Sequence, residues 1–364
     1  MRYERPIFIA GILPSCNSLY PVLVLIRRAS HICAREAGVT VGTVSRALNN
    51  YPDVSPTTRE RIVETAQRLG YRPNQMARNL SSKHNHNIAL VLSGFLEEEL
   101  INDFDALLMK GCFHYTVNND VEMSIQVINT KIQTEKSFEQ LCYEHNIAGA
   151  ILMGLRTNDP YCKLLAKSKY PCVTIDIEVP GPNVSCVMMD DIKAFDELTQ
   201  YLIDKGHRKI VVVHGRKLAM VSMQRLVGAY QAMQRNGLEL PRDNIIYTNF
   251  GREEARDGVK EYFRTHSPDS ATAFLCMSDM LAIGTIEGLK ELGYKVPKDY
   301  SVVGFDGLEV TNYTDPAITT IDQNIQQKGY EATRLLCDMI RGKRKAQRLV
   351  LPHTLTVRDS VRPL

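Results

Sequence analysis

The sequence predicts an α/β chain in which a small helical head precedes a two-lobed body built on parallel sheets. From Asn87 onward, short and nearly continuous apolar segments alternate with segments of helix length, the pattern of parallel strands buried on both faces. The preceding part carries short helical patterns separated by turns. A length of 364 residues fits a head plus two lobes of ordinary domain size.

Residues 1–28 are expected to form an atypical N-terminal extension. The stretch from Pro6 to Ile26 is uncharged and follows two arginines, as in an export signal or a poor membrane segment. Prolines and polar residues interrupt it, so a membrane-spanning helix is not expected. The extension is interpreted as a genuine part of the chain, or as the product of an upstream start or a disturbed reading frame just before Ala34.

Residues 29–73 predict a compact helical head. The segment from Ala34 to Asn49 predicts two short helices joined at Gly38, because glycine tolerates the left-handed backbone of a tight turn. Thr40 lies where the second helix needs an N-cap. The outward face of that helix is small, polar and basic, as in the recognition helix of a helix-turn-helix unit. Positions spaced to face inward are Ala37, Val39, Val44 and Leu48, and those facing outward are Val41, Gly42, Ser45, Arg46 and Asn49.

A third helix completes the head, and a short hinge segment follows it. Ser55 is the expected N-cap and Pro56 the first helical residue, while Gly70 ends the helix. Residues 74–86 are expected to contain a hinge helix, capped by Asn74, and a linker. Because that helix is only about one to two turns long, it needs a partner to fold against.

Residues 87–364 are expected to form the two-lobed body. In parallel sheets, ligands bind beyond the carboxyl ends of the strands. The chain is expected to cross between the lobes three times, including crossings from Asn324 onward and after about Leu349. Strands are expected at 87–92, 148–153, 172–176, 209–213, 273–277 and 300–305, and helices at 192–205, 225–236, 252–265, 279–292 and 325–341.

The distribution of charge separates the head from the body. The net charge is only +3, yet residues 1–80 carry eleven arginines against five acidic residues, so the body is slightly acidic. A basic head on such a body is typical of a modular DNA-binding protein. The nine cysteines show no metal-ligand or Cys-x-x-Cys spacing, which suits a reducing cytoplasm. The sequence contains no phosphate-cradling glycine loop, no metalloprotease helix motif and no nucleophile elbow, so no metal, cofactor or catalytic nucleophile is expected.

Polar side chains follow several of the expected strands. Asp176, Ser278 and Asp306 each lie at a carboxyl end, and Arg225 is expected to open a helix. Because the carboxyl ends of parallel strands share one edge, these groups are expected to converge on a cleft suited to a sugar or another hydroxyl-rich molecule. Each could instead be a helix cap or part of a loop salt bridge.

Several motifs occur in order at the spacing of a known family. Residues 35–39 (Arg-Glu-Ala-Gly-Val), 43–46 (Thr-Val-Ser-Arg) and 70–74 (Gly-Tyr-Arg-Pro-Asn), followed by Ala77 and Leu80, resemble the DNA-binding head and hinge helix of the lactose/purine repressor family. The resemblance runs from about residue 34 to the C-terminus.

For DNA binding, the resemblance implies a recognition helix in the major groove and a hinge helix in the minor groove. Val41, Gly42 and Arg46 would read base edges, with Arg46 able to make a bidentate contact to guanine. Leu80 would enter a base step and kink the DNA. The implied DNA-binding residues are Thr40, Val41, Gly42, Thr43, Ser45, Arg46, Asn49, Ser55, Asn74, Ala77, Arg78 and Leu80.

The body resembles the effector-binding core of the same family, which is similar to periplasmic sugar-binding proteins. Two departures from the family pattern leave the effector open. Ser278 stands where asparagine is common, and the stretch from Ser93 to Ile101 carries three consecutive glutamates in place of the usual apolar-aromatic segment. The implied effector-binding residues are Ser93, Asp176, Met188, Arg225, Ser278, Asp306 and Gln323.

The resemblance therefore implies a ligand-responsive, sequence-specific DNA-binding regulator of transcription, a repressor of genes for sugars or other carbon sources. It implies a cytoplasmic protein that is not an enzyme and needs no cofactor or metal. The expected partners are palindromic double-stranded operator DNA, a small-molecule effector such as a sugar, and a second copy in a homodimer, with no membrane. The lack of a leucine heptad tail argues against a coiled-coil tetramer.

Two other functions remain open at this point. The first is a solute-binding protein of a transport system, in which the uncharged N-terminal stretch would be an export signal. The second is a sugar-modifying enzyme that uses Asp176 and Asp306 as paired carboxylates, although no further catalytic motif supports it.

Overall fold

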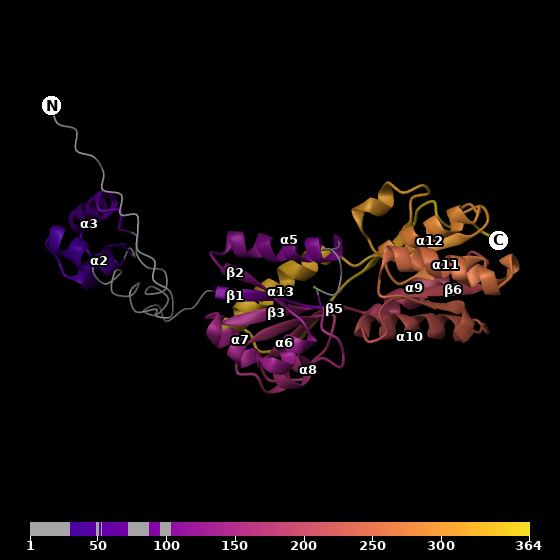
Figure 1. Ribbon diagram of the computed structural model, residues 1–364, viewed down its shortest axis with the longest axis horizontal. Coiled ribbons are helices and arrows are strands. Elements are labelled where there is room, and N and C mark those ends of the chain that lie inside the picture. Colours follow the sequence, from indigo (N-terminus) through magenta and orange to yellow (C-terminus); the bar gives the residue numbers. More distant parts are fainter. Residues whose placement is uncertain (1–29, 49–50, 52, 72–86, 95–102) are drawn as a thin grey trace, which may run out of the picture. The chain divides into compact units, whose positions relative to one another are not determined.

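The computed structural model describes residues 30–48, 51, 53–71, 87–94 and 103–364 (Figure 1). The chain divides into two compact units, Met1–Asn85 and His86–Leu364. The predicted extension at 1–28 and the stretch 95–102 lie outside the described residues. So do five of the predicted DNA-binding residues, namely Asn49, Asn74, Ala77, Arg78 and Leu80.

The head consists of three short helices around a small core. Residues 30–36 are helical, and α2 (Val41–Leu48) and α3 (Pro56–Arg68) follow. The predicted turn is confirmed, because Gly38 has a φ of 64°, which costs glycine no Cβ clash. The core between the helices is made of Cys33, Ala34, Ala37, Val44, Ala47, Val54, Ile62 and Ala66.

The first lobe of the body is a six-stranded parallel sheet in the order β11-β5-β4-β3-β1-β2. Its strands are β1 (Asn87–Ser93), β2 (Glu122–Ile128), β3 (Gly149–Met153), β4 (Cys172–Ile175), β5 (Val184–Met189) and β11 (Arg348–Leu351).

Helices cover both faces of this first sheet (Figure 1). Side chains of β1 alternate between them, since Ile88 and Leu90 pack towards α5 and α13 while Ala89 and Val91 pack towards α7 and α8. The helices are α5 (Asp103–Asn118) and α13 (Ile325–Ile340) on one face, and α6 (Thr130–Glu135), α7 (Phe138–Glu144) and α8 (Pro160–Leu164) on the other.

Helices α5 and α13 touch through their backbones. A Cβ added at Gly111 would lie 1.9 Å from the carbonyl oxygen of Gln326, and one added at Gly329 would lie 2.1 Å from that of Leu108. Glycine at these two positions is therefore what allows the helices to approach so closely, and it fixes α13 against the first lobe.

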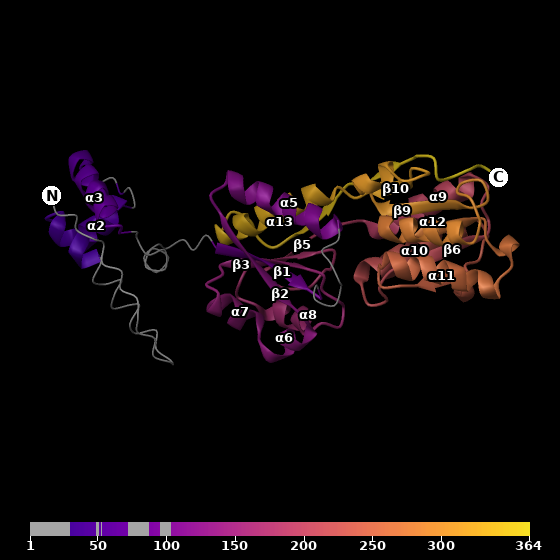
Figure 2. The same cartoon turned by 45° about the horizontal axis from the view of Figure 1, so that its top comes forward.

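The second lobe is again a sheet flanked by helices (Figure 2), and its strand order is β12-β10-β9-β8-β6-β7. All pairings are parallel except that of β12 with β10. The strands are β6 (Ile210–His214), β7 (Ile245–Tyr247), β8 (Ala273–Cys276), β9 (Ser301–Asp306), β10 (Thr319–Asp322) and β12 (Thr354–Thr356), and the helices are α9 (Asp191–Asp204), α10 (Met220–Arg235), α11 (Arg252–Thr265) and α12 (Asp279–Glu291).

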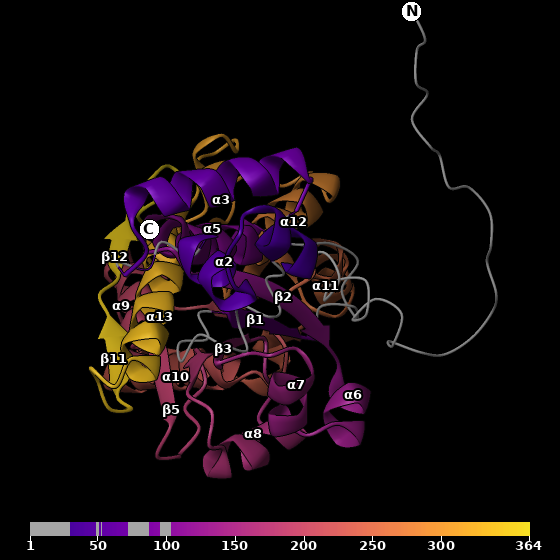
Figure 3. The ribbon, with the colours of Figure 1, turned by 90° about the vertical axis from the view of Figure 1, so that its left-hand side faces the viewer.

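The three predicted crossings between the lobes are confirmed. The chain leaves the first lobe between β5 and α9, returns between β10 and α13, and leaves again between β11 and β12. Figure 3 shows β11 and β12 following each other along the last, yellow part of the chain.

Most predicted elements match the structure, with one correction that affects the site. Helix α10 begins at Met220, so Arg225 lies in its second turn and does not open it. The residue before the helix, Ala219, has no capping side chain, so no sequence signal marks this earlier start. The elements not predicted are β2, β5, β7, β10, β11, β12, α5, α6, α7 and α8. Among the described residues, no helix has the length and apolarity needed to cross a membrane.

Candidate functional site

A cavity of about 210 Å³ lies between the two lobes of the body. It is smaller than the roughly 300–1,000 Å³ of pockets for drug-sized ligands, so it suits a small molecule. Both lobes line it, as expected from strands that end at a common edge. Six of the seven predicted effector-binding residues lie in its wall, namely Ser93, Asp176, Arg225, Ser278, Asp306 and Gln323.

The seventh predicted residue, Met188, lies elsewhere in the fold. It is buried in β5, and its sulfur accepts a hydrogen bond of 3.3 Å from Nε of Arg348. It is not among the described residues that line the cavity. Its assignment to the site therefore has no support in this geometry, because its side chain packs within the first lobe.

Arg225 is held by buried partners on three sides. Its Nε lies 2.7 Å from Oδ1 of Asp191, and its Nη1 donates to the carbonyl oxygen of Met277 at 2.5 Å. The guanidinium carbon lies 3.8 Å from the ring centroid of Phe305, an arrangement that favours a cation over an aromatic face. Because these contacts fix the side chain, its remaining N–H groups can face the cavity in one orientation.

Asp306 presents a carboxyl group with an unusual protonation state. Burial raises its pKa to about 8; Arg225 opposes this rise and the nearby Asp279 adds to it. Its Oδ1 accepts a hydrogen bond of 2.6 Å from Nε2 of Gln323. A neutral carboxyl group can donate as well as accept a hydrogen bond, so Asp306 can act as donor or as acceptor towards a ligand hydroxyl.

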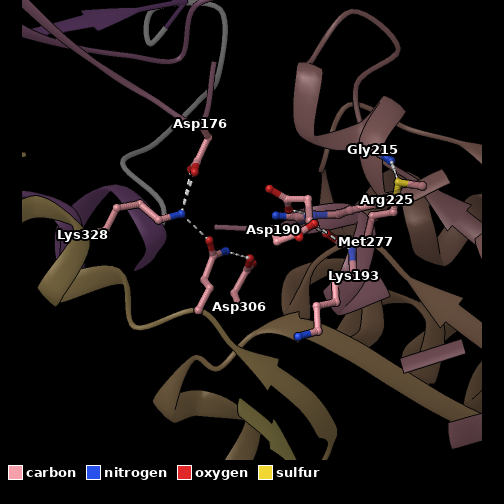
Figure 4. Close-up of polar contacts among 10 residues, drawn as sticks. Asp176, Asp190, Lys193, Gly215, Arg225, Met277, Asp306 and Lys328 are labelled. Atoms are coloured by element: carbon pink, nitrogen blue, oxygen red, sulfur yellow. Dashed lines mark hydrogen bonds and ion pairs between the residues drawn. The ribbon is translucent and has the colours of Figure 1, made fainter. Parts of the chain in front are cut away.

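A buried lysine that the sequence analysis did not select connects the two lobes. Nζ of Lys328 lies 2.8 and 2.9 Å from the carboxylate oxygens of Asp176 and 2.6 Å from Oε1 of Gln323 (Figure 4). A sequence signal existed, because Lys328 falls in the stripe of buried positions of α13 that includes Ile325, Ala332 and Leu336. Such a lysine on a buried helix face needs a partner.

The two serines in the wall already serve structural partners. The Ser278 hydroxyl caps α12 by accepting from the backbone N–H of Leu281 at 3.2 Å. The Ser93 hydroxyl accepts from Nε2 of Gln133 at 2.8 Å and donates to Asp159 at 3.3 Å. The helix-cap alternative therefore applies to Ser278, although a capping hydroxyl can still donate to a ligand.

Aromatic and basic side chains complete the wall. Phe104 and Phe250 supply apolar surface, and Arg156 and Arg216 come from loops of opposite lobes. Those loops meet, because the backbone N–H of Thr157 donates to the carbonyl oxygen of Leu218 at 3.2 Å. Polar groups beside apolar rings match a sugar, which presents hydroxyls at its edges and C–H groups on its faces. Among the described residues, no group of three or more His, Cys, Asp or Glu could hold a metal ion.

Replacing Asp306 with asparagine is expected to change how stability depends on pH. From pH 4 to 8, the folded chain keeps a proton on Asp306 that the unfolded chain releases. The contribution of this group to the free energy of unfolding is therefore fully present at low pH, and it falls by up to about 1.4 kcal/mol per pH unit as the pH rises. The difference in thermal midpoint between variant and wild type should grow from pH 5 to pH 8. Parallel curves for the variant and the wild type would contradict the raised pKa of Asp306.

In the head, the predicted outward face of α2 is mostly confirmed. Gly42, Ser45 and Arg46 are exposed, whereas Val41 is half-buried. Val41 packs against the head core, so its placement on the outward face is corrected. Its neighbour Thr40 begins the helix as predicted, because its hydroxyl accepts from the backbone N–H of Thr43 at 3.2 Å.

Arg46 is the basic group on this face. Its guanidinium lies 2.8 Å from a carboxylate oxygen of Asp53 and 6.0 Å from the ring centroid of Tyr51. Its side chain is 58% exposed, and an exposed ion pair of this kind contributes only about 0–1 kcal/mol. The pair can thus orient Arg46 without preventing it from turning to another partner.

Ser55 has a capping role that can be separated from DNA contact. Its Oγ accepts from the backbone N–H of Thr58 at 3.3 Å, at the start of α3. Ser55→Ala should lower the opening free energy of α3 by about 0.5–2 kcal/mol, measured by amide hydrogen exchange on the full chain. Ser55→Asp keeps a capping oxygen and should restore protection. Unchanged exchange in Ser55→Ala would remove the capping role.

Comparisons with known proteins match both the head and the body of the chain. The model of the bacterial regulatory proteins of the lacI family matches residues 33–74, and the periplasmic binding protein-like domain matches residues 199–361. The HTH-type transcriptional regulator CelR of Thermobifida fusca is 31% identical over 92% of this chain and 98% of its own length. The chain belongs to the lacI family. The HTH-type transcriptional repressor CytR of Escherichia coli is 30% identical over 85% of this chain and 89% of its own length.

Solved structures agree with this membership. A transcriptional regulator CelR–cellobiose complex has a TM-score of 0.69 and 29% identity over 91% of this chain and 99% of its own. The lac repressor dimer bound to operator has a TM-score of 0.79 over 91% of this chain and 98% of its own, and at 21% identity shows the shared fold. As a lacI-family member, this chain is a ligand-responsive DNA-binding transcriptional regulator. The transport alternative is wrong, because full-length regulators match the head together with the body.

Proposed function

We propose that the cavity between the lobes binds a sugar and that its occupancy changes the affinity of the head for an operator, so that the chain acts as a repressor of sugar or other carbon-source genes. The observation that carries the proposal is the wall itself, where Arg225 and Asp306 of one lobe face Asp176 of the other. A hydroxyl can donate to a carboxylate and accept from a guanidinium at once, so adjacent hydroxyls of one sugar would bridge the lobes.

The CelR–cellobiose complex supports a sugar as the ligand class. The test uses cellobiose, ribose and related sugars in a thermal-shift screen of the full chain, followed by DNA binding with each sugar that binds. The proposal predicts that a binding sugar changes DNA affinity about 5–150-fold, the usual range of allosteric coupling. A sugar that binds in the cavity and leaves DNA affinity unchanged would contradict it.

The head is proposed to read an inverted repeat in the major groove through Thr40, Gly42, Thr43, Ser45 and Arg46. Val41, which is half-buried, and Ser55, which caps α3, are proposed to lie at the margin of this DNA-reading face. The predicted residues outside the described ranges, Asn49 and the hinge residues Asn74, Ala77, Arg78 and Leu80, stay predictions from the sequence. Selection of DNA from a random pool tests the inverted repeat, and an enriched sequence without two-fold symmetry would contradict it.

A homodimer is proposed because two-fold symmetric DNA is bound by two-fold symmetric proteins. Exposed apolar side chains on neighbouring elements of the first lobe offer a surface for it, namely Phe113 and Val117 on α5 and Ile125 on β2. Sedimentation of the full chain should show a species of twice 41.1 kDa. A species of that single mass at the concentrations used for DNA binding would contradict the dimer.

A further inference from the structure

Lys328 is fully buried, and its ammonium group is completely used. Its side chain has 0% exposure, and its three hydrogen bonds go to the two carboxylate oxygens of Asp176 and the side-chain oxygen of Gln323. An ammonium group has three donors, so none remains. Burying a charge is costly unless it is paired and hydrogen-bonded, and both conditions hold here.

The partners of Lys328 belong to different parts of the body. Asp176 follows β4 of the first lobe, Gln323 lies on the crossing between β10 and α13, and Asp306 ends β9 of the second lobe. Since Gln323 also donates to Asp306 at 2.6 Å, an unbroken chain of contacts runs across the crossing, as Figure 4 shows. Asp176, Gln323 and Asp306 line the cavity.

The charge of Lys328 fixes the direction of this chain. An ammonium can face only the oxygen of the Gln323 amide, so the amide nitrogen must point to Asp306. Asp306 then receives the Gln323 donor on Oδ1, and its carboxyl group lines the cavity in that orientation. A neutral side chain at 328 would leave the amide free to turn, because neither of its ends would be selected.

One end of the chain is rigid and the other is not. Helix α13 is locked against α5 by the backbone contacts at Gly111 and Gly329, so the base of Lys328 is fixed to the first lobe. Asp306 belongs to the second lobe, which joins the first through three crossings. A change in the angle between the lobes must therefore lengthen or break the chain at Gln323.

We propose that Lys328 is the positioning residue of the effector site: its charge holds Asp176, Gln323 and Asp306 in one donor–acceptor pattern and links ligand contacts of one lobe to those of the other. The inference rests on the proposed sugar site. It deepens that proposal by assigning to a residue outside the cavity wall the control of how the two halves of the site come together.

A double-mutant cycle on the ligand-free full chain tests the link between the lobes. Lys328 and Asp306 do not contact each other, so Lys328→Met and Asp306→Ala should have additive effects on the free energy of unfolding if each serves only its own lobe. The proposal predicts clear non-additivity, because both substitutions break the same chain. Additive effects would overturn it, whatever sugar the protein binds.

Calorimetry with cellobiose and ribose tests the effect on the site. Lys328→Met should weaken the sugar that binds wild type more than tenfold. The charge-neutral pair Lys328→Met with Asp176→Asn should regain stability, which separates a stranded Asp176 charge from a general failure to fold; the affinity comparison rests on Lys328→Met alone, because Asp176 itself lines the cavity. Wild-type affinity in Lys328→Met would overturn the inference. If wild type binds neither sugar, the choice of sugar in the proposed function fails, while the cycle still decides the role of Lys328.

Chemical rescue separates charge from filled volume. In Lys328→Ala, added propylammonium should raise the thermal midpoint, whereas propanol at the same concentration should not. Equal effects of the two compounds would show that Lys328 only fills space and would overturn the positioning role.

Discussion

Replacing Arg225 with alanine is expected to abolish the response to effector and to lower the free energy of unfolding of the body by about 3–5 kcal/mol. The reason is Asp191, whose side chain has 0% exposure and pairs with Arg225 at 2.7 Å. Without the guanidinium, this buried carboxylate loses its paired cation, and its Oδ2 has no hydrogen-bond partner among the residues that the structure describes. Denaturant unfolding and sugar calorimetry on the full chain measure the two effects.

A second variant separates stability from binding. Asp191→Asn added to Arg225→Ala removes the stranded charge, so it should recover most of the lost stability without recovering sugar binding. If the sugar is an inducer, the double variant should still bind DNA, because the head is a separate compact unit. If the sugar is a corepressor, it should bind DNA weakly under all conditions. Wild-type sugar affinity in the double variant would remove Arg225 from the site.

Replacing Arg46 with alanine is expected to cost about 1–3 kcal/mol of sequence-specific DNA binding, or roughly 5–150-fold in affinity. Arg46 lies on the exposed face of α2, and its ion pair with Asp53 is too exposed to hold it there. A guanidinium in this place can make a bidentate contact to guanine. Fluorescence anisotropy with the selected operator and with random DNA measures the change.

Arg68 provides a matched control for Arg46. It is 66% exposed and pairs with Glu36 at 3.7 Å, yet it lies at the end of α3 and not on the outward face of α2. Arg68→Ala should have a small effect that is similar on both DNAs. Equal losses on operator and random DNA in Arg46→Ala would show that Arg46 contacts only phosphates.

The sequence predicted most of the central strands for a physical reason, although it missed β5 and β10, which also lie inside their sheets. Strands β1, β3, β4, β8 and β9 are buried on both faces, so they appear as continuous apolar runs. The edge strand β2 is half-exposed and shows neither a run nor a clean alternation. Helix α5 was missed because its interior glycine and apolar residues on all sides hide the helical period.

The sequence predicted the residues that line the cavity better than the buried charged residues that support them. Asp176 and Asp306 lie at the carboxyl ends of predicted strands, so topology alone places them at the cavity, whereas Gln323 was implied only by the family resemblance because β10 was not predicted. Lys328 and Asp191 come from helices, where charged side chains are usually solvated. Their burial depends on how helices from distant parts of the chain pack, and a single sequence does not contain that information directly.

The dissociation constant of the full chain for its selected operator, with and without a sugar that binds the cavity, tests the central claim most directly. The account predicts a change of at least about fivefold in wild type and no change in Arg225→Ala with Asp191→Asn. A sugar effect of full size in that double variant would contradict control of DNA binding from the cavity between the lobes.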